Sequence, residues 1–534
     1  MDTLRAASFG VTMKIEHVDA SSRRIQAWVD AARIRPLASL REVGGIRLPD
    51  YAVPRIGSVT SAGDGILLAG ALRSREGLDG SGVTVGVISD SAGTASLNGA
   101  FLSGDLPDPS AILIGSNPAG TDEGTAMMEI IHDLAPGADL AFYGVQTDLD
   151  MTTAIEWLAS VAGCDVIVDD LGFFFEPYFE DGPIAKKAAE VVARGVSYHS
   201  AAGNEAPEHY AGTYRPLLVG GIERHDFGGG DTTMKIRIGG GGAADVILQW
   251  SEPFGKAAAN YDLVILAGDE VTEVAASRTV QNGSGDPVES VHLVNTAASA
   301  VTRNVTIERK SGPIEDLKMF TLGATVLEHA VLRGSIFGQP GVAGVVAATA
   351  ISAFDPGHDT IERFASRGPT RIDFPSPVVR EKPDVASIDA VAVSGQSGFP
   401  TIFSGTSAAA PHTAAVAAFL VQGGLTTPAD VRNCLQQGAV DLGAPGTDEV
   451  FGAGRVDAVA AFDVCLDRNC GDANGDGLRN ATDALVALRT AIGLASCPLC
   501  RCDLDDRGRI TVGDALAILQ SAIGLPVALM CARC

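Results

Sequence analysis

Positive charge is scarce in this chain. Its 534 residues include 39 Lys and Arg against 65 Asp and Glu, which gives a formal net charge of −26 at pH 7. Such a charge opposes binding to nucleic acid or to an anionic membrane surface, because both are themselves negative. The sequence also lacks an apolar run long enough to span a membrane. We therefore expect neither nucleic acid nor a membrane as a partner.

A secretory signal and cysteine residues are also lacking over most of the chain. The start, Met1 to Arg5, lacks the apolar segment of a secretory signal. Cysteine is also rare over most of the chain: before the last 70 or so residues only Cys164 and Cys434 occur. We expect both to be buried thiols. The hydrophobic fraction of 46% is sufficient for a sizeable core, and the length predicts several domains.

The most distinctive motif is Gly-Thr-Ser at residues 405–407, followed by Pro411. Gly405 permits a tight turn, and the apolar residues 413–421 predict a buried helix after it. A Ser at such a helix start presents its hydroxyl beside free backbone N–H groups, which can stabilise an oxyanion. Ser407 is therefore a candidate nucleophile. A Ser that only caps the helix is the alternative.

This Gly-Thr-Ser-x-x-x-Pro pattern resembles the nucleophile motif of subtilisin-like serine peptidases, and other segments resemble that family in order along the chain. Residues 80–91 predict a buried strand that ends in Asp90 and resembles the family's aspartate strand. Residues 166–172 resemble the strand leading into the substrate-binding edge. Residues 201–204 resemble the turn whose Asn, here Asn204, donates to the oxyanion. The resemblance implies an α/β fold, with a parallel sheet covered by helices on both faces.

The sequence departs from the family where a catalytic His is expected, because Glu123 stands at that position. A carboxylate can take a proton from a Ser hydroxyl, and the related sedolisin family uses a Ser, Glu and Asp set. Sedolisins place their Asp one helical turn later, where this chain has Met127. The resemblance thus implies that Glu123 is the base and that Asp90 orients it or shares its proton. A carboxylate that only favours the helix start is the alternative.

The aspartate strand allows two alignments. An ungapped match places Ser89 at the aspartate position, whereas a local bulge would restore Asp90. Asp122 is a rival partner for Glu123. His132 lies beyond Glu123 on the same predicted helix, and we expect it to be a packing residue, as we do His412 in the nucleophile helix.

The C-terminal region contains a duplication, because residues 483–494 recur as 514–525. Each copy predicts a helix preceded by an acidic loop. The second loop has Arg507 where a ligand is expected, so we expect it to bind Ca²⁺ weakly or not at all. The paired units resemble a dockerin module, which implies a cohesin-type protein partner. The first loop has the oxygen-ligand spacing of an EF-hand-type Ca²⁺ site, from Asp472, Asn474, Asp476, the Leu478 carbonyl, Asn480 and Asp483.

The cysteines of this region allow two interpretations. Two Cys-x-x-Cys pairs, at 497–500 and 531–534, suit a tetrahedral zinc site. Disulfides suit a small exported module with little core, and we favour them. The odd number of cysteines leaves at least one without a partner inside the module.

We expect five parts. Residues 1–76 form an N-terminal extension, for which a propeptide remnant and an ordinary extension are both open. Residues 77–215 and 336–463 form the two parts of a peptidase core. Strand-like runs separated by turns at 216–335 predict an inserted antiparallel β-sandwich, and residues 464–534 form the dockerin-like module.

The expected function is that of a secreted serine endopeptidase acting on protein or peptide substrates, although no signal peptide is visible at the N-terminus. The alternative is an inactive homologue that acts as a Ca²⁺-dependent binding or scaffold-docked protein, because the family's His is missing.

Overall fold

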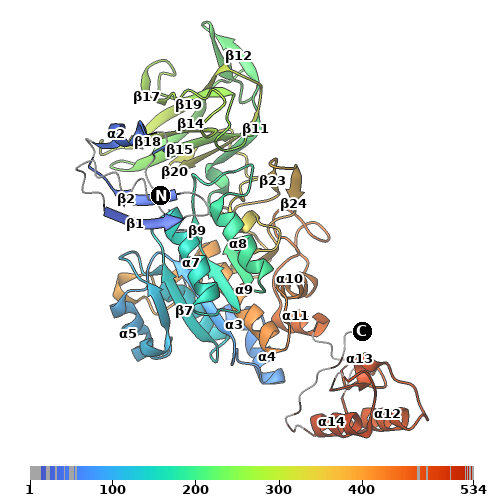
Figure 1. Ribbon diagram of the computed structural model, residues 1–534. Helices are drawn as coiled ribbons and strands as arrows, with labels where there is room; N and C mark the ends of the chain where they lie inside the picture. Colours follow the sequence, from blue (N-terminus) through green and yellow to red (C-terminus); the bar gives the residue numbers. More distant parts are fainter. Residues whose placement is uncertain are drawn as a thin grey trace.

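A computed structural model describes residues 14–19, 24–30, 33–40, 43–46, 53–54, 57–59, 61–465, 470–476, 479–505, 507–523, 525, 527 and 531. Figure 1 shows a β-rich part at the top, an α/β part in the middle and a small helical part at the lower right. No helix in the described ranges is long and apolar enough to cross a membrane.

The α/β part is built on a seven-stranded sheet with the order β25-β22-β10-β8-β5-β7-β6. All neighbouring strands in it are parallel. Its central strands are buried throughout most of their length, as expected for a parallel sheet covered on both faces. The strands are β5 (Thr84–Ser89), β6 (Leu113–Ser116), β7 (Asp139–Gly144), β8 (Val166–Asp169), β10 (Ser197–Ala201), β22 (Val346–Ser352) and β25 (Val385–Asp389).

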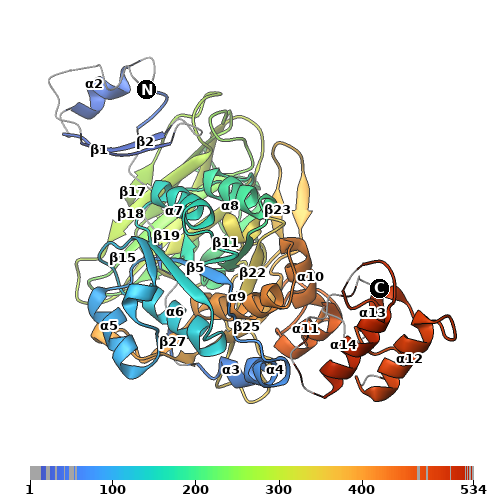
Figure 2. The same ribbon diagram turned by 60° about the horizontal axis from the view of Figure 1, so that its bottom comes forward.

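Helices cover both faces of this sheet. Figure 2 shows α7 and α8 side by side on one face, with α6 and α9 on the other. Each face has its own buried apolar cluster, and the larger one includes the Ala-rich helix α9. The predicted α/β fold is thus confirmed. The helices are α3 (Gly63–Ile66), α4 (Ala69–Glu76), α5 (Thr94–Ser103), α6 (Glu123–Leu134), α7 (Asp148–Ser160), α8 (Pro183–Ala193), α9 (Thr406–Gln422), α10 (Pro428–Gln437) and α11 (Ala458–Cys465).

Two antiparallel sheets lie between β10 and β22 in the sequence, and their inner faces form a separate apolar core around Trp250 and Tyr261. One sheet has the order β11-β20-β15-β18, and the other contains β12, β13, β19, β14 and β21, with β16 and β17 joined to it. The first of these strands begins at His209, whereas the sequence predicts the insertion to begin at residue 216. The strands are β11 (His209–Thr213), β12 (Pro216–Val219), β13 (Ile222–His225), β14 (Met234–Ile238), β15 (Ala243–Trp250), β16 (Asn260–Leu266), β17 (Glu273–Ser277), β18 (Val288–Val294), β19 (Val301–Ser311), β20 (Asp316–Leu322) and β21 (Thr325–Val326).

Short strands connect the N-terminal residues to the α/β part. Strand β3 (Val53–Pro54) pairs antiparallel with β9 (Leu171–Gly172). Strand β4 (Gly57–Val59) pairs antiparallel with β27 (Ile402–Ser404) just before α9. The remaining short elements are β1 (Lys14–Asp19), β2 (Arg24–Trp28), α2 (Ile34–Ala38), β23 (Thr370–Ile372), β24 (Val378–Arg380) and β26 (Val391–Ala392).

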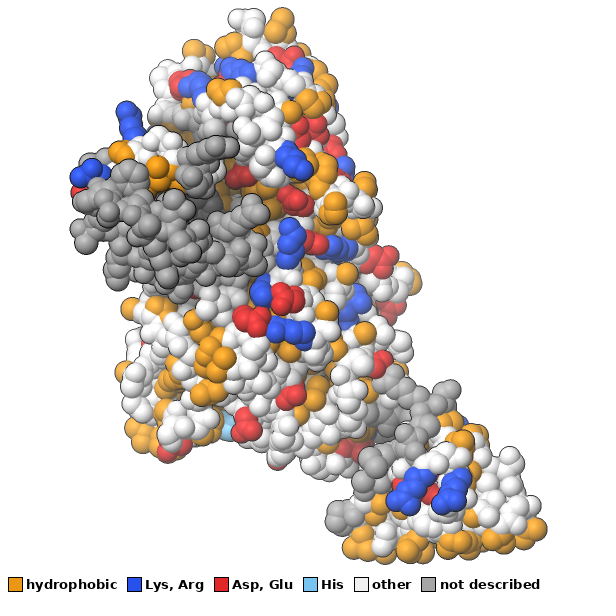
Figure 3. Space-filling view, viewed as in Figure 1, with side chains coloured by type: hydrophobic (Ala, Val, Ile, Leu, Met, Phe, Trp, Pro, Cys, Tyr) orange, Lys and Arg blue, Asp and Glu red, His pale blue; other side chains and the backbone are white. Residues whose placement is uncertain are grey.

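The C-terminal module consists of α12 (Ala481–Ala491), α13 (Leu499–Cys502) and α14 (Val512–Ala522). The two long helices start with the same capping box, Asn480 with Asp483 and Thr511 with Asp514, as the duplication predicts. Apolar side chains that are exposed on both helices line the lower edge of the module in Figure 3.

The cysteines that the structure describes in this region are disulfide-bonded. Cys470 pairs with Cys531, Cys497 pairs with Cys502, and Cys500 is also disulfide-bonded. The expectation of a free thiol at Cys434 is wrong, because Cys434 is bonded to Cys465 at the end of α11. Cys465, at the start of the C-terminal region, is thus bonded to a cysteine outside that region. This agrees with the expectation that the odd number of cysteines leaves at least one without a partner inside the module. Cys164 is a buried free thiol, as expected.

Candidate active site

The predicted site residues meet at the carboxyl ends of the parallel strands, where open α/β sheets bind ligands. Asp90 follows β5, and Asn204 follows β10 after a short turn. Glu123 is the first residue of α6, and Ser407 lies in the first turn of α9. Helices α6 and α9 pack against each other, so their first turns bring Glu123 and Ser407 together.

The turn before Ser407 depends on glycine. Gly405 has φ 103° and ψ 166°, a conformation that L residues with side chains rarely adopt. Its N–H donates to Oδ2 of Asp389 at 2.8 Å, which fixes the turn to the end of β25. Burial raises the pKa of Asp389 to about 7. Ser407 is thus held by a strained turn with a buried acidic anchor.

Asn204 is tied to the same turn. Its Oδ1 accepts from the N–H and the hydroxyl of Thr406, at 3.0 and 2.9 Å. The Thr406 hydroxyl also accepts from the N–H of Gly203 at 3.1 Å. Asn204 itself donates its N–H to Glu205 at 2.9 Å. The Asn turn and the nucleophile helix therefore form one hydrogen-bonded unit.

Asp90 binds the start of α6. Its carboxylate accepts from the backbone N–H of Thr121 and, at 3.3 Å, from that of Glu123. The N–H of Glu123, at the start of α6, is thereby satisfied, and a carboxyl group lies near the positive end of the helix. The structure thus brings Asp90 to the backbone of Glu123.

Asp122, the rival partner, is engaged elsewhere. Its carboxylate accepts from the N–H of Gly93 at 2.6 Å and from the hydroxyl of Ser96 at 2.5 Å, both at the start of α5. Asp122 also has φ 69°, which turns the chain into α6. Its role is to join α5 and α6.

The side chain of Glu123 has a neighbour that the sequence did not identify as a site residue. The carboxyl of Asp170, just after β8, and the hydroxyl of Ser407 are both neighbours of the Glu123 carboxyl and act on its pKa. Neither oxygen of the Glu123 carboxyl has a hydrogen-bond partner among the residues that the structure describes. All three side chains have 0% of their surface exposed. A usable signal was present in the sequence, because Asp169 and Asp170 end an otherwise apolar strand.

Burial dominates the electrostatics of this cluster. Burial, followed by the negative charges of Asp170 and Asp90, raises the pKa of Glu123 well above its ordinary value, against a smaller lowering effect of the Ser407 hydroxyl. Burial and the charge of Asp90 raise the pKa of Asp170 to about 8. Both carboxyl groups therefore favour the protonated form more strongly than exposed carboxyl groups do.

The histidines lie where packing residues are expected. His412 is fully buried in α9 and donates its Nδ1–H to the carbonyl of Ala408 at 2.7 Å. Burial lowers its pKa to about 4, so it is neutral at ordinary pH. Burial also lowers the pKa of His132 near the end of α6.

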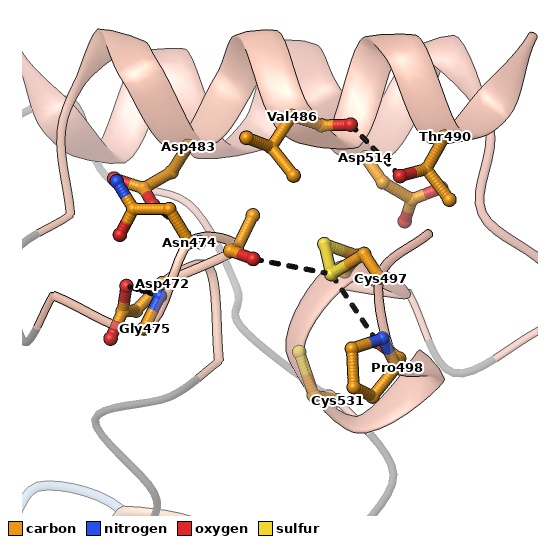
Figure 4. The surroundings of a disulfide bond; sticks show 12 residues. Asp472, Asn474, Gly475, Asp483, Val486, Thr490, Cys497, Pro498, Asp514 and Cys531 are labelled. Carbon is orange, nitrogen blue, oxygen red and sulfur yellow. Dashed lines mark hydrogen bonds between the residues drawn. A yellow bond between two sulfur atoms is a disulfide. The ribbon is translucent and has the colours of Figure 1, made fainter. Parts of the chain in front are cut away.

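The first acidic loop of the C-terminal module brings three carboxylates together. Asp472, Asp476 and Asp483 each offer an oxygen, and these oxygens lie within 4.8 Å of one another. Asp472 and Asp483 are buried, and like charges at this distance favour a bound cation. Figure 4 shows Asp472, Asn474 and Asp483 beside Cys497. These residues fit Ca²⁺; Leu478 lies outside the described residues.

The second loop brings Asp503, Asp505 and Asp514 together in the same way. Here, however, Nε of Arg507 forms an ion pair with Asp505 at 3.3 Å. The guanidinium competes with a metal for this carboxylate. The first loop has no Arg at the matching position. An ion pair in the second loop alone is what we expect if that loop binds Ca²⁺ more weakly.

Known proteins resemble this chain in sequence and structure. The model of the Subtilase family of peptidases matches residues 111–454. The subtilisin-like protease SBT4.12 of Arabidopsis thaliana is 26% identical over 372 residues, which are 62% of this chain and 48% of that protein. The chain thus spans about half the length of this curated relative. The structure of the Clostridium perfringens CspB protease matches with a TM-score of 0.56 and 13% identity, over 76% of this chain and 99% of that one, and supports the fold.

Proposed function

Since the chain belongs to the subtilase family, we propose that it is a serine endopeptidase in which Ser407 is the nucleophile and Glu123 is the general base. One observation supports this most strongly. The hydroxyl of Ser407 is a neighbour of a carboxyl that is fully buried at the start of a helix and whose two oxygens have no hydrogen-bond partner in the described part of the chain. A buried carboxyl with a raised pKa is a stronger base than an exposed one, and it can therefore replace an imidazole.

The proposed reaction has two halves. Oγ of Ser407 forms a bond to the substrate carbonyl carbon while its proton moves to the Glu123 carboxylate. The protonated Glu123 then gives that proton to the amide nitrogen as the C–N bond breaks, which leaves an acyl-enzyme. Water then hydrolyses the acyl-enzyme: its proton goes to Glu123 and its oxygen binds the acyl carbon. The C–Oγ bond breaks, the proton returns to Oγ from Glu123, and the carboxylic acid product leaves.

Asn204 and the N–H of Ser407 are the proposed donors to the oxyanion. The contact between Asn204 Oδ1 and Thr406 supports this assignment, because it leaves the amide NH₂ as the part of Asn204 that faces away from Thr406. Asp90 supports Glu123 through the backbone, by holding its N–H at the start of α6.

We further propose that residues 1–76 include a propeptide remnant. Strand β3 adds to Leu171–Gly172, the strand that resembles the substrate-binding edge, and β4 adds to the strand leading to Ser407. An extended segment that pairs with a sheet edge has the backbone geometry of a bound peptide. Arg24 also forms an ion pair with Asp148 at the start of α7. Cleavage of this segment would open the site.

The C-terminal module is proposed to bind Ca²⁺ and a cohesin-type protein. Residues Asp472, Asn474, Asp476, Asn480 and Asp483, with the Leu478 carbonyl, would hold the ion, and the ion would neutralise the loop. The disulfides support an extracellular location, because such bonds persist in oxidising compartments.

The test of the peptidase proposal is cleavage of an unfolded protein by the wild type and by Ser407→Ala. We expect cleavage by the wild type alone, and a loss of at least about a hundredfold in Glu123→Gln. Glu129→Gln is the matched control, because Glu129 is a second buried carboxyl of α6 that accepts from Ser394 instead. A wild type that binds the substrate without cleaving it would support the inactive binding protein.

A further inference from the structure

Asp170 is held in register with the strand that carries Asp90. Strands β5 and β8 are parallel neighbours, with Ile88 opposite Asp169. The next residues along the two strands are Ser89 and Asp170, and the Ser89 hydroxyl donates to Oδ2 of Asp170 at 3.3 Å. Ser89 is the residue that an ungapped alignment places at the family's aspartate position. The structure thus has a carboxyl on the adjacent strand, one hydrogen bond away from that position.

The Glu123 and Asp170 carboxyls form a hydrogen bond only when one of them is protonated. An ionised carboxylate accepts hydrogen bonds but has none to donate. Both side chains are fully buried, so water does not separate the two negative charges. Two carboxyls that share one site hold a proton between them, because both cannot ionise at ordinary pH.

We propose that Asp170 is the positioning residue for Glu123: a proton shared by their carboxyl groups holds the Glu123 side chain against the hydroxyl of Ser407. The inference rests on the proposed function, because it gives Glu123 its role as base. It differs from the contact with Asp90, which holds the backbone of Glu123. Backbone and side chain of the base would thus be held by different carboxyl groups.

The protons balance in this arrangement. With one proton on the pair, Asp170 donates to one oxygen of Glu123, and the other oxygen accepts from Ser407. When Oγ attacks, its proton moves to Glu123, which leaves two neutral carboxyls and one oxyanion. Asp170 keeps its proton throughout and does not touch the substrate.

The Glu123 and Asp170 pair also sets the pH at which Glu123 is ionised and can act as a base. Burial raises the pKa of Asp170, and so do two neighbouring carboxylates, Asp90 after β5 and Asp169 at the end of β8. Asp170 and Asp90 in turn raise the pKa of Glu123. Activity therefore rises as the pair loses its first proton, and it falls at higher pH as the pair loses the shared second proton, a loss that the existing negative charge opposes.

Two variants of the full chain test the proposal. Asp170→Asn keeps a donor for Glu123 but removes the charge. We expect kcat within about tenfold of the wild type, and the fall in activity that accompanies loss of the pair's second proton at alkaline pH should disappear. Asp170→Ala removes the donor. We expect kcat to fall about a hundredfold with little change in KM, because a small misplacement of the base is costly.

Glu129→Gln, the control on the same helix, should leave the alkaline limb in place. An unchanged alkaline limb in Asp170→Asn would overturn the proposal, and so would an unchanged kcat in Asp170→Ala. Infrared spectroscopy gives a readout that needs no activity. The difference spectrum of the wild type minus Asp170→Asn should contain, at neutral pH, the carbonyl band of a protonated carboxyl; the subtraction removes the contribution of other buried carboxyls such as Asp389. Absence of the band from this difference spectrum would contradict the shared proton, whereas an inactive wild type that shows it would contradict only the peptidase proposal.

Discussion

Oδ1 of Asn204 accepts hydrogen bonds from both the N–H and the hydroxyl of Thr406, the residue before the candidate nucleophile. A backbone N–H can only donate, so this contact identifies the atom facing Thr406 as the amide oxygen. The orientation of Asn204 is therefore set by the nucleophile turn, and the two proposed parts of the oxyanion site depend on each other.

Thr406→Val should reduce kcat without a matching change in KM. The valine keeps the backbone N–H but loses the hydroxyl that joins Gly203 to Asn204. We expect a loss of about tenfold, compared with about 10²–10³ for Asn204→Ala, which removes the donor itself. Steady-state kinetics on a short peptide measure both. A larger loss in Thr406→Val than in Asn204→Ala would contradict this order.

Gly405→Ala should destabilise the fold and abolish cleavage. A side chain at φ 103° costs about 1–3 kcal/mol of unfolding free energy, and relaxation of this strain would move Ser407. Gly65→Ala in α3 is the control, because a Cβ there meets nothing within 4 Å. Denaturant unfolding of the two variants should show a lower midpoint for Gly405→Ala alone.

The pH dependence of stability should report the buried Asp389. Its pKa in the folded chain, about 7, is higher than the ordinary value for an exposed Asp of about 3.9. Between these values the folded chain binds more protons than the unfolded chain, so this group's contribution to stability is lost as pH rises toward 7. Asp389→Asn keeps an oxygen for the Gly405 N–H but does not ionise. The melting temperature of the variant relative to the wild type should therefore rise between about pH 4 and 7 and then level off; an opposite slope would contradict the assignment.

Chelation should loosen the C-terminal module and leave cleavage of a small peptide intact. The first loop holds buried carboxylates that repel one another without a cation, and its helix starts at the same residues. Asp476→Ala should mimic the chelator, and Asp505→Ala, already paired with Arg507, should do much less. Calorimetry with Ca²⁺ on the full chain is the measurement. Two equally tight sites in the module would contradict the asymmetry.

The parts of the site that lie in one short segment were predicted from the sequence. The turn at Gly405, the helix after Ser407 and the duplicated helices of the module follow from local composition. The parallel sheet and the turn at Asn204 followed from the resemblance to subtilisin-like peptidases, and the buried apolar run ending at Asp90 supported it.

What the sequence did not predict depends on contacts between distant segments. Asp170 meets Glu123 only because β8 and β5 are neighbours, and strand order has no local signal. The bond between Cys434 and Cys465 likewise depends on how α10 packs against α11. The pairing of β3 with the edge at Leu171 depends on the course of the N-terminal residues.

The most direct test of the central claim is the site of covalent labelling by a fluorophosphonate, located by mass spectrometry after incubation at several pH values. The account predicts one adduct, on Ser407, that is absent from Ser407→Ala and forms at least about tenfold more slowly in Glu123→Gln than in Glu129→Gln. An adduct on another residue, or labelling of Ser407→Ala at the wild-type rate, would contradict it.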